Sequence, residues 1–177
     1  MYISNPGSKS IIHVLLFSTS DNLVTLGSRI PAVWTHATLG DTNSRSLHIS
    51  SGVNTNANDY KDSKRVEKNQ WHLITVEQKL VDSKYIYSVH VNGELLYTTE
   101  NTNPKTYKNV KVYVSDPWYA SLDGQIKDLK VKSSKGENIL SLFFILERQF
   151  SIDLKNSNYS KLLPIEAELM YNLKDHY

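Results

Sequence analysis

Two short segments of the sequence are rich in the oxygen-bearing side chains that a calcium ion prefers. The segment VNTNANDY supplies Asn54, Asn56, Asn58 and Asp59, and the segment TSDNL supplies Asp21. Hard cations such as Ca²⁺ are bound by carboxylate, amide and backbone oxygens, so both segments are candidate calcium ligands. The alternative is that these side chains accept hydrogen bonds from the backbone of their own turns. The residues alone leave both interpretations open.

Aromatic side chains next to polar ones are the second feature that can do chemistry. The segment DPWY contains Asp116, Trp118 and Tyr119 in a predicted loop, and Trp34 lies two residues before His36. An aromatic face beside a few polar groups is a common composition of a small-molecule site, and it suits a sugar ring with its hydroxyls. We therefore predict ligand binding by these five residues. The alternative for Trp118 is that it anchors its loop by burying a large apolar surface.

Nothing in the pattern of nucleophiles or histidines indicates an enzyme. The sequence has no cysteine and no Gly-x-Ser-x-Gly motif. No two of its histidines have the helical i, i+4 spacing or the local clustering that is typical of zinc ligands. Four of them fall in predicted strands, where a surface or half-buried role is the simplest interpretation: His13, His48, His72 and His90. We predict a protein that is not an enzyme and has no cofactor other than calcium.

The composition describes an ordinary globular domain. The chain has 177 residues, 40% of them hydrophobic, which is enough to bury a core without disulfides. Its formal net charge is +2, and its basic stretches Lys61–Lys68 and Lys105–Lys111 are interrupted by acidic or aromatic residues, which argues against nucleic acid. The longest apolar stretch, Ile139–Leu146, is too short for a transmembrane segment. Residues 1–20 lack the pattern of a signal peptide.

Hydrophobic residues recur with a period of two through most of the chain. The pattern predicts strands at Ile11–Phe17, at Trp71–Gln78 and at Tyr85–Val91. The last of these leads directly into Asn92-Gly93, a dipeptide that favours the type I′ turn of a two-residue hairpin. Many short strands separated by turns predict an all-β fold with two packed antiparallel sheets.

Three features of residues 28–131 form a recognisable combination: Trp71 at the start of a long strand, the Val91–Gly93 hairpin, and the run VKVYVSDPWY followed by DGQIKDLKV. With these features the segment resembles the laminin-G/concanavalin A-like jelly-roll repeats of large extracellular proteins. The resemblance implies a two-sheet antiparallel jelly-roll sandwich and an extracellular, secreted location. It also implies a lectin-like function in carbohydrate binding or in cell and matrix adhesion. Relatives of this kind hold calcium at the rim of the sandwich, which implies calcium-dependent binding.

The resemblance does not extend to the β-glucanase branch of the same superfamily. A retaining glycosidase needs two carboxylates about 5–5.5 Å apart, which alternate residues of one strand can supply. The nearest pairs here are Glu166 with Glu168 and Asp123 with Asp128, and neither matches the family motif E-x-D-x-x-E. A glycoside hydrolase is therefore the least favoured function. The alternative to a glycan or protein ligand is a structural module that assembles with neighbouring repeats or a second chain.

The C-terminal residues 141–177 are predicted to complete the sandwich that residues 1–140 form. Repeats of the resembled kind begin with a strand that is missing before Ile11, and a matching segment, FSIDL at Phe150–Leu154, occurs near the end instead. Because an open sheet edge exposes unpaired backbone groups, we predict that Phe143–Leu154 pairs with the sandwich, within the chain or across a homodimer. The alternative is a loosely packed extension. Lys161–Leu173 is predicted to form a short helix.

Overall fold

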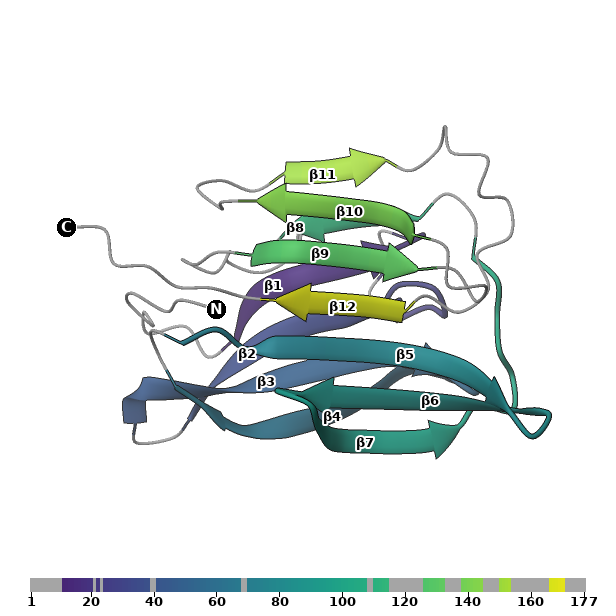
Figure 1. Cartoon of the computed structure of the whole chain (residues 1–177), viewed down its shortest axis with the longest axis horizontal. Helices are drawn as coiled ribbons and strands as arrows, with labels where there is room; N and C mark the ends of the chain where they lie inside the picture. Colours follow the sequence, from purple (N-terminus) through teal and green to yellow (C-terminus); the bar gives the residue numbers. More distant parts are fainter. Residues whose placement is uncertain are drawn as a thin grey trace.

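The computed structural model describes residues 11–20, 22, 24–38, 41–67, 70–107, 110–114, 126–132, 138–144, 150–153 and 166–170. Every regular element among these residues is a β-strand (Figure 1). The strands are β1 (Ile11–Ser18), β2 (Ala32–Thr38), β3 (Asp41–Val53), β4 (Asn56–Val66), β5 (Leu73–Val81), β6 (Lys84–Val91), β7 (Glu94–Glu100), β8 (Lys111–Val114), β9 (Ile126–Lys132), β10 (Asn138–Phe144), β11 (Phe150–Asp153) and β12 (Glu166–Met170).

The strands form two six-stranded sheets. Sheet A has the order β11-β8-β1-β2-β3-β4, and sheet B has the order β10-β9-β12-β5-β6-β7. All of the strand pairings are antiparallel. In Figure 1 the central strands of sheet B lie one above the other in front of β1, β2 and β3 of sheet A. The prediction of an all-β fold with two antiparallel sheets is confirmed.

The hydrophobic core lies between the two sheets, because alternate residues of each strand point to the same face. Sheet A contributes buried side chains such as Phe17 and Ile49, and sheet B contributes Ile74 and Leu129. The alternation of apolar residues predicts a core that includes Ile12, Val14, Leu73 or Ile74, Val89, Val91, Val112 and Ile126. Of these, Val14, Ile74, Val89, Val112 and Ile126 are buried. Val91, also predicted, is only partly buried at the edge of the cluster. The backbone of Ile12 belongs to β1, and its side chain is not among those that the structure describes.

Two tyrosine hydroxyls connect the sheets by hydrogen bonds inside this layer. The Tyr87 hydroxyl of β6 donates to Ser51 Oγ of β3 at 2.8 Å, and the Tyr97 hydroxyl of β7 donates to Asp59 Oδ2 of β4 at 2.8 Å. Burial raises the pKa of the Tyr87 hydroxyl well above its ordinary value. Tyr87 therefore stays protonated and keeps donating across the core at any physiological pH.

The turn between β6 and β7 has the conformation that its two residues predict. Asn92 and Gly93 have φ angles of 54° and 81°, both in the left-handed region that a type I′ turn requires. The Asn92 side chain also accepts a hydrogen bond from the Leu73 backbone N–H at 2.9 Å. The turn is therefore fixed both by its own backbone and by the start of β5.

Replacing Gly93 by valine is expected to lower the free energy of unfolding by about 1–2 kcal/mol, the cost of a left-handed conformation for a residue with a Cβ. A Cβ at this position would meet no atom within 4 Å, so the whole loss comes from the backbone. Gly93→Asn is the matched control, because asparagine tolerates this region. Urea denaturation measures both variants. Equal losses would show that the cost is not conformational.

The C-terminal strands pair with the rest of the sandwich within one chain. Strand β10 forms a hairpin with β9, and β11 lies along β8, with Phe150 opposite Val114. Within the predicted segment Phe143–Leu154, the described residues 143–144 and 150–153 belong to these two strands. The edge of β8 that faces away from β1 is thereby covered.

The helix predicted at Lys161–Leu173 is wrong in its described part, since Glu166–Met170 is strand β12. This strand lies between β9 and β5, with Ala167 opposite Val131 on one side and opposite Val76 on the other. The sequence from Ile165 to Leu169 alternates apolar and acidic residues, which also fits a period of two. The two neighbouring strands decide between the two periods, because an extended segment can form hydrogen bonds to both of them and a helix cannot.

Candidate functional site

A row of side chains crosses the outer face of sheet A, on the side away from the core. In β2 the residues Val33 and Thr35 point inward, so that Trp34 and His36 point outward. The pairing of β2 with β3 places Trp34 opposite His48, and the pairing of β3 with β4 places His48 opposite Asp62. Because residues directly opposite each other share a face, these side chains meet across three strands.

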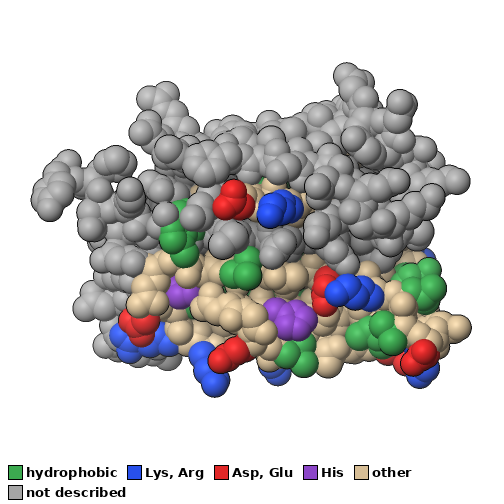
Figure 2. Space-filling view, in the orientation of Figure 1, with side chains coloured by type: hydrophobic (Ala, Val, Ile, Leu, Met, Phe, Trp, Pro, Cys, Tyr) green, Lys and Arg blue, Asp and Glu red, His purple; other side chains and the backbone are tan. Residues whose placement is uncertain are grey.

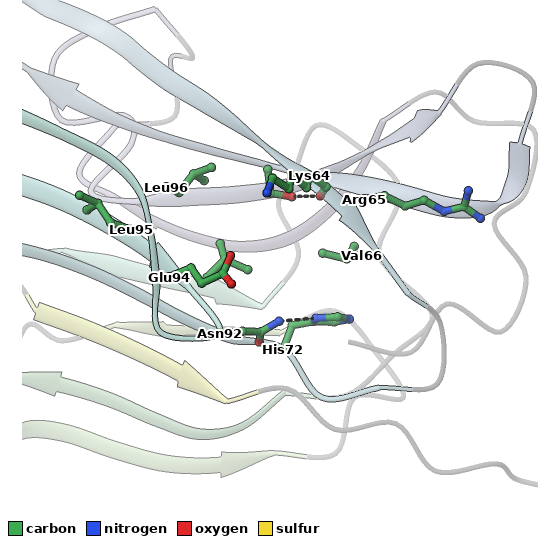
Figure 3. Close-up of a pocket in the computed structure, with 10 residues that line it drawn as sticks. Lys64, Arg65, Val66, His72, Asn92, Glu94, Leu95 and Leu96 are labelled. Carbon is green, nitrogen blue, oxygen red and sulfur yellow. Dashed lines mark hydrogen bonds between the residues drawn. The ribbon is translucent and has the colours of Figure 1, made fainter.

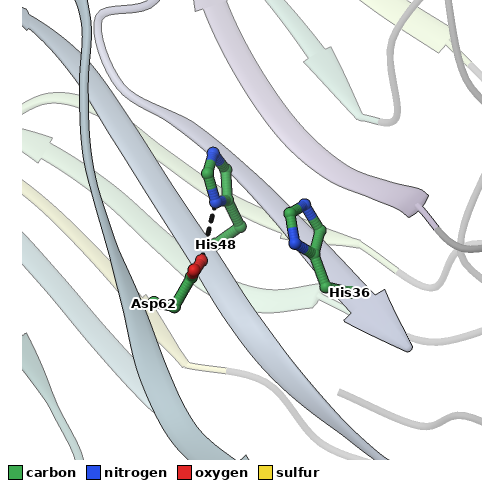
Figure 4. A group of neighbouring side chains, drawn as sticks. All are labelled: His36, His48 and Asp62. Atoms are coloured by element: carbon green, nitrogen blue, oxygen red, sulfur yellow. Dashed lines mark hydrogen bonds and ion pairs between the residues drawn. The ribbon is translucent and has the colours of Figure 1, made fainter. Parts of the chain in front are cut away.

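Two histidines and one aspartate lie closest together in this row (Figure 4). The Nδ1 atom of His48 is 2.7 Å from Asp62 Oδ1, a hydrogen-bonded ion pair when the ring carries a second proton. The imidazole rings of His36 and His48 are stacked, with centroids 4.5 Å apart and planes 13° from parallel. One ligand atom from each of the three residues falls within 4.8 Å of the others.

The aromatic neighbours of the cluster have unequal access to solvent. Trp34 is only 4% exposed, with the Arg29 guanidinium 5.4 Å from its ring centroid and the His48 ring at 5.6 Å. Tyr60 of β4 is 51% exposed, and its ring lies 4.4 Å from that of His48. The Trp34 ring is therefore buried and packs against His48, whereas the Tyr60 ring is accessible to a ligand.

The charge state of His36 follows from its surroundings. Burial lowers the pKa of the His36 imidazole most, and the nearby His48 lowers it further. Asp62 raises this pKa by less than His48 lowers it, and Arg45 adds the smallest lowering effect. The Arg45 side chain is buried on the inner side, where its Nε–H donates to Thr35 Oγ1 at 2.8 Å. His36 is therefore neutral at pH 7 and presents one ring nitrogen with a free lone pair.

A hollow of about 180 Å³ lies beside this row and is lined by Ile11, Arg29, Trp34, His36, His48 and Asn58. Asn58 belongs to β4, and its Oδ1 accepts a hydrogen bond of 2.7 Å from Ser50 Oγ. The hollow thus combines a cation, amide and imidazole groups with an aromatic floor. We define the candidate site as this hollow together with Tyr60 and Asp62.

The outer face of sheet B has a different character. Figure 2 shows it with acidic and basic side chains next to one another rather than separated into patches. Lys79 pairs with Glu77 at 2.6 Å, and Lys84 pairs with Glu100 at 2.9 Å. The pair of Lys84 and Glu100 is solvent-exposed, and such pairs contribute little to stability. On the described part of this face they leave no concentrated field for a charged ligand.

A larger hollow, of about 300 Å³, opens between the edges of β4 and β7 (Figure 3). His72 lies in its wall with both ring nitrogens engaged. Nε2–H donates to the Glu67 carbonyl at 2.9 Å, and Nδ1 accepts from the Asn92 side chain at 3.3 Å. Burial lowers the pKa of His72, which keeps this neutral arrangement in place. His72 therefore holds this end of the sandwich together, and the charged side chains that line the hollow are those of Lys64, Arg65 and Glu94.

The structure does not bring the predicted calcium ligands together. Asn58 and Asp59 are successive residues of β4 and point to opposite faces, Asn58 toward Ser50 and Asp59 toward Tyr97. Asn56 Oδ1 accepts from the backbone N–H of Asn58 at 2.9 Å. These oxygens accept hydrogen bonds from side chains and backbone of sheets A and B. Asp21 lies outside the described residues.

Asn54 has a structural role of its own at the β3–β4 turn. Its Oδ1 accepts from the backbone N–H of Thr102 at 2.7 Å, and its own backbone N–H donates to Asn101 Oδ1 at 3.0 Å. The Asn101 side chain in turn donates to Gln78 Oε1 at 2.7 Å. This network ties the turn of sheet A to the end of β7 in sheet B. These bonds join residues that are far apart in the sequence, unlike the hydrogen bonds within single turns that were the predicted alternative to calcium.

Of the predicted ligand-binding residues, the structure brings Trp34 and His36 together in the candidate site. Asp116, Trp118 and Tyr119 lie outside the described residues. His48, Tyr60 and Asp62 were not predicted as functional residues, and His48 had been interpreted as an ordinary strand residue. Their only sequence signal was alternation within each strand, which does not reveal which strands are neighbours or in what register.

Comparison with protein-family models, with curated proteins and with solved structures finds no match to this chain. None of the described residues belongs to a helix of the length and apolarity that crossing a membrane requires.

Proposed function

We propose that the protein is a non-catalytic binding module of an extracellular protein, of the laminin-G/concanavalin-like jelly-roll kind, and that it binds carbohydrate on the outer face of sheet A. Two packed antiparallel sheets support this class of fold. The observation that carries the proposal is the half-exposed Tyr60 ring next to the polar side chains of His48 and Asp62. A sugar ring has an apolar face for stacking and hydroxyls that need donors and acceptors at its rim.

The residues around Tyr60 supply both requirements. The ring is held by its contact with His48, so little side-chain freedom is lost when a ligand stacks on it. Asp62, whose side chain is 47% exposed, offers carboxylate oxygens to hydroxyl groups on one side. Asn58 and Arg29, which line the hollow, offer amide and guanidinium N–H groups on the other. The site thus supplies both the stacking surface and the hydrogen-bonding groups that an uncharged sugar needs.

Screening the chain on a glycan array, with calcium and with a chelator, is expected to identify at least one bound glycan. Tyr60→Ala should weaken its binding roughly tenfold, because an aromatic contact contributes about 0.5–1.5 kcal/mol beyond the area it buries. Tyr60→Phe should bind like the unchanged chain. Tyr85→Ala, which removes a tyrosine from β6 in sheet B, is the matched control. An array on which nothing binds under either condition would rule the proposal out.

Assembly with neighbouring repeats or a second copy is the alternative function. It is favoured by large apolar side chains that are exposed on sheet B, Leu80 in β5 and Leu95 in the edge strand β7. Single exposed apolar residues are normal, but an edge strand next to one can pair with another chain. A molecular mass that rises with concentration in light scattering, together with an empty glycan array, would favour this alternative.

A further inference from the structure

We propose that His36, His48 and Asp62 form a binding site for one divalent transition-metal ion, such as zinc. The three residues come from the neighbouring strands β2, β3 and β4, and their ligand atoms lie within 4.8 Å of one another. This inference goes beyond carbohydrate binding and does not depend on it, since the ion requires no glycan. It also differs from the calcium site that the sequence predicted, in both residues and metal.

The donor atoms decide which kind of ion fits. Two imidazoles and one carboxylate suit zinc and its first-row neighbours, whereas calcium and magnesium prefer ligand sets made of oxygen. Zinc sites that keep an open position commonly have three protein ligands of this type, with water in the fourth position. The Asp62 side chain is 47% exposed and that of His48 12%, so solvent reaches the cluster from the Asp62 side.

The observed spacing is close to the spacing that zinc requires. Zinc lies about 2.0–2.2 Å from nitrogen and oxygen ligands, so two ligand atoms in a tetrahedral site are about 3.4 Å apart. His48 Nδ1 and Asp62 Oδ1 are 2.7 Å apart and share a proton. An ion that replaces this proton needs the two atoms to open slightly, and the proton is released to solvent. The ligand atom of His36 lies within 4.8 Å of the other two ligand atoms. To reach a spacing of about 3.4 Å, it must therefore move closer to them by no more than about 1.4 Å.

One rearrangement of the rings is also required. A metal ion lies in the plane of the imidazole that binds it, but the rings of His36 and His48 are stacked with their planes 13° from parallel. The His36 ring therefore turns about its Cβ–Cγ bond to direct a nitrogen at the ion, a torsion with broad energy wells. The positive charge of Arg45, whose field reaches His36, opposes a divalent ion. We accordingly expect weaker binding than at a closed structural zinc site.

Zinc titrated into the full chain, followed by calorimetry with a competing chelator, is expected to show one ion bound per chain. His36→Gln, His48→Gln and Asp62→Asn should each weaken zinc binding at least tenfold. His90→Gln removes a histidine from β6 of sheet B and should leave the affinity unchanged, which makes it the matched control. Circular dichroism and thermal melts of each variant separate loss of the site from loss of the fold.

Long-range ¹H–¹⁵N NMR of the imidazole nitrogens identifies the ligands directly in the unchanged chain. Zinc is expected to shift the His36 and His48 signals and to leave those of His72 and His90 in place. Zinc binding that survives the double variant His36→Gln/His48→Gln, shifts confined to other histidines, or displacement of zinc by millimolar calcium would each overturn the proposal. The absence of saturable zinc binding would do so as well, and none of these results depends on a glycan.

Discussion

A chain that ends at residue 165, just before β12, is expected to lose cooperative folding, whereas a chain that ends at residue 170 keeps it. Strand β12 is an inner strand of sheet B, paired with β9 on one side and with β5 on the other. Without it the sheet separates into the pair β10-β9 and the group β5-β6-β7, which leaves two inner edges of unpaired backbone next to the core. Exposed edges of this kind aggregate.

The same result is expected from one substitution in the full-length chain. Proline at position 168 removes a backbone N–H in the middle of β12, where both neighbours are strands, and proline is excluded from such positions. Glu168→Thr, which keeps the N–H and favours a strand, is the matched control. Thermal unfolding by circular dichroism and light scattering measure all four chains. A soluble, cooperatively melting chain that ends at residue 165 would show that β12 is an accessory.

Replacing Phe17 by alanine is expected to lower the free energy of unfolding by about 3–5 kcal/mol, the usual loss for a buried phenylalanine. Phe17 is fully buried in the layer between the sheets. Its backbone is fixed on one side by two hydrogen bonds, since its N–H donates to the Pro31 carbonyl at 2.9 Å and its carbonyl accepts from the Ile30 N–H at 2.9 Å. On the other side Phe17 pairs with Val112 of β8. The strand therefore cannot move inward to fill the cavity, and a loss near the upper end of the range follows.

Urea denaturation measures this loss, with Phe17→Leu as the control that keeps most of the apolar volume. The leucine variant should lose substantially less stability than the alanine variant, because the residual cavity sets much of the cost. Since natural domains are stable by only about 5–15 kcal/mol, the alanine variant should also melt at a clearly lower temperature. A loss below 1 kcal/mol would mean that the core closes around the smaller side chain.

The sequence was sufficient to predict the kind of fold, because the fold depends on patterns within single strands. Alternation in segments such as Trp71–Gln78 marks which side chains face the core, and Asn92-Gly93 fixes one hairpin through its own backbone preferences. Such signals need no knowledge of the partner strand. In Ile165–Leu169 the helical period and the strand period fit the sequence equally well. The segment is a strand because it pairs with β9 on one side and β5 on the other, so the predicted helix was wrong.

The candidate site was predicted in part, for a related reason. Trp34 and His36 drew attention as neighbours in the chain, but His48 and Asp62 are 12 and 26 residues away from His36 in the sequence. They reach it through the register of three strands, which also includes an irregularity between Ser46 and His48 in the pairing with β4. The sequence does not reveal this register, because the alternation within each strand looks the same whichever residues of the neighbouring strand lie opposite.

The position of β12 also determines the order in which the molecule is completed. The last of the described strands along the chain has to enter between β9 and β5, which precede it by roughly 40 and 90 residues. Pairings of such long sequence separation raise the contact order and slow folding. On the ribosome, at about 5–20 residues per second, the β5–β7 meander would wait several seconds with one edge unfilled. We infer that sheet B closes only after β12 has been synthesised and that, until then, the unpaired edge of β5 is where a chaperone would be needed.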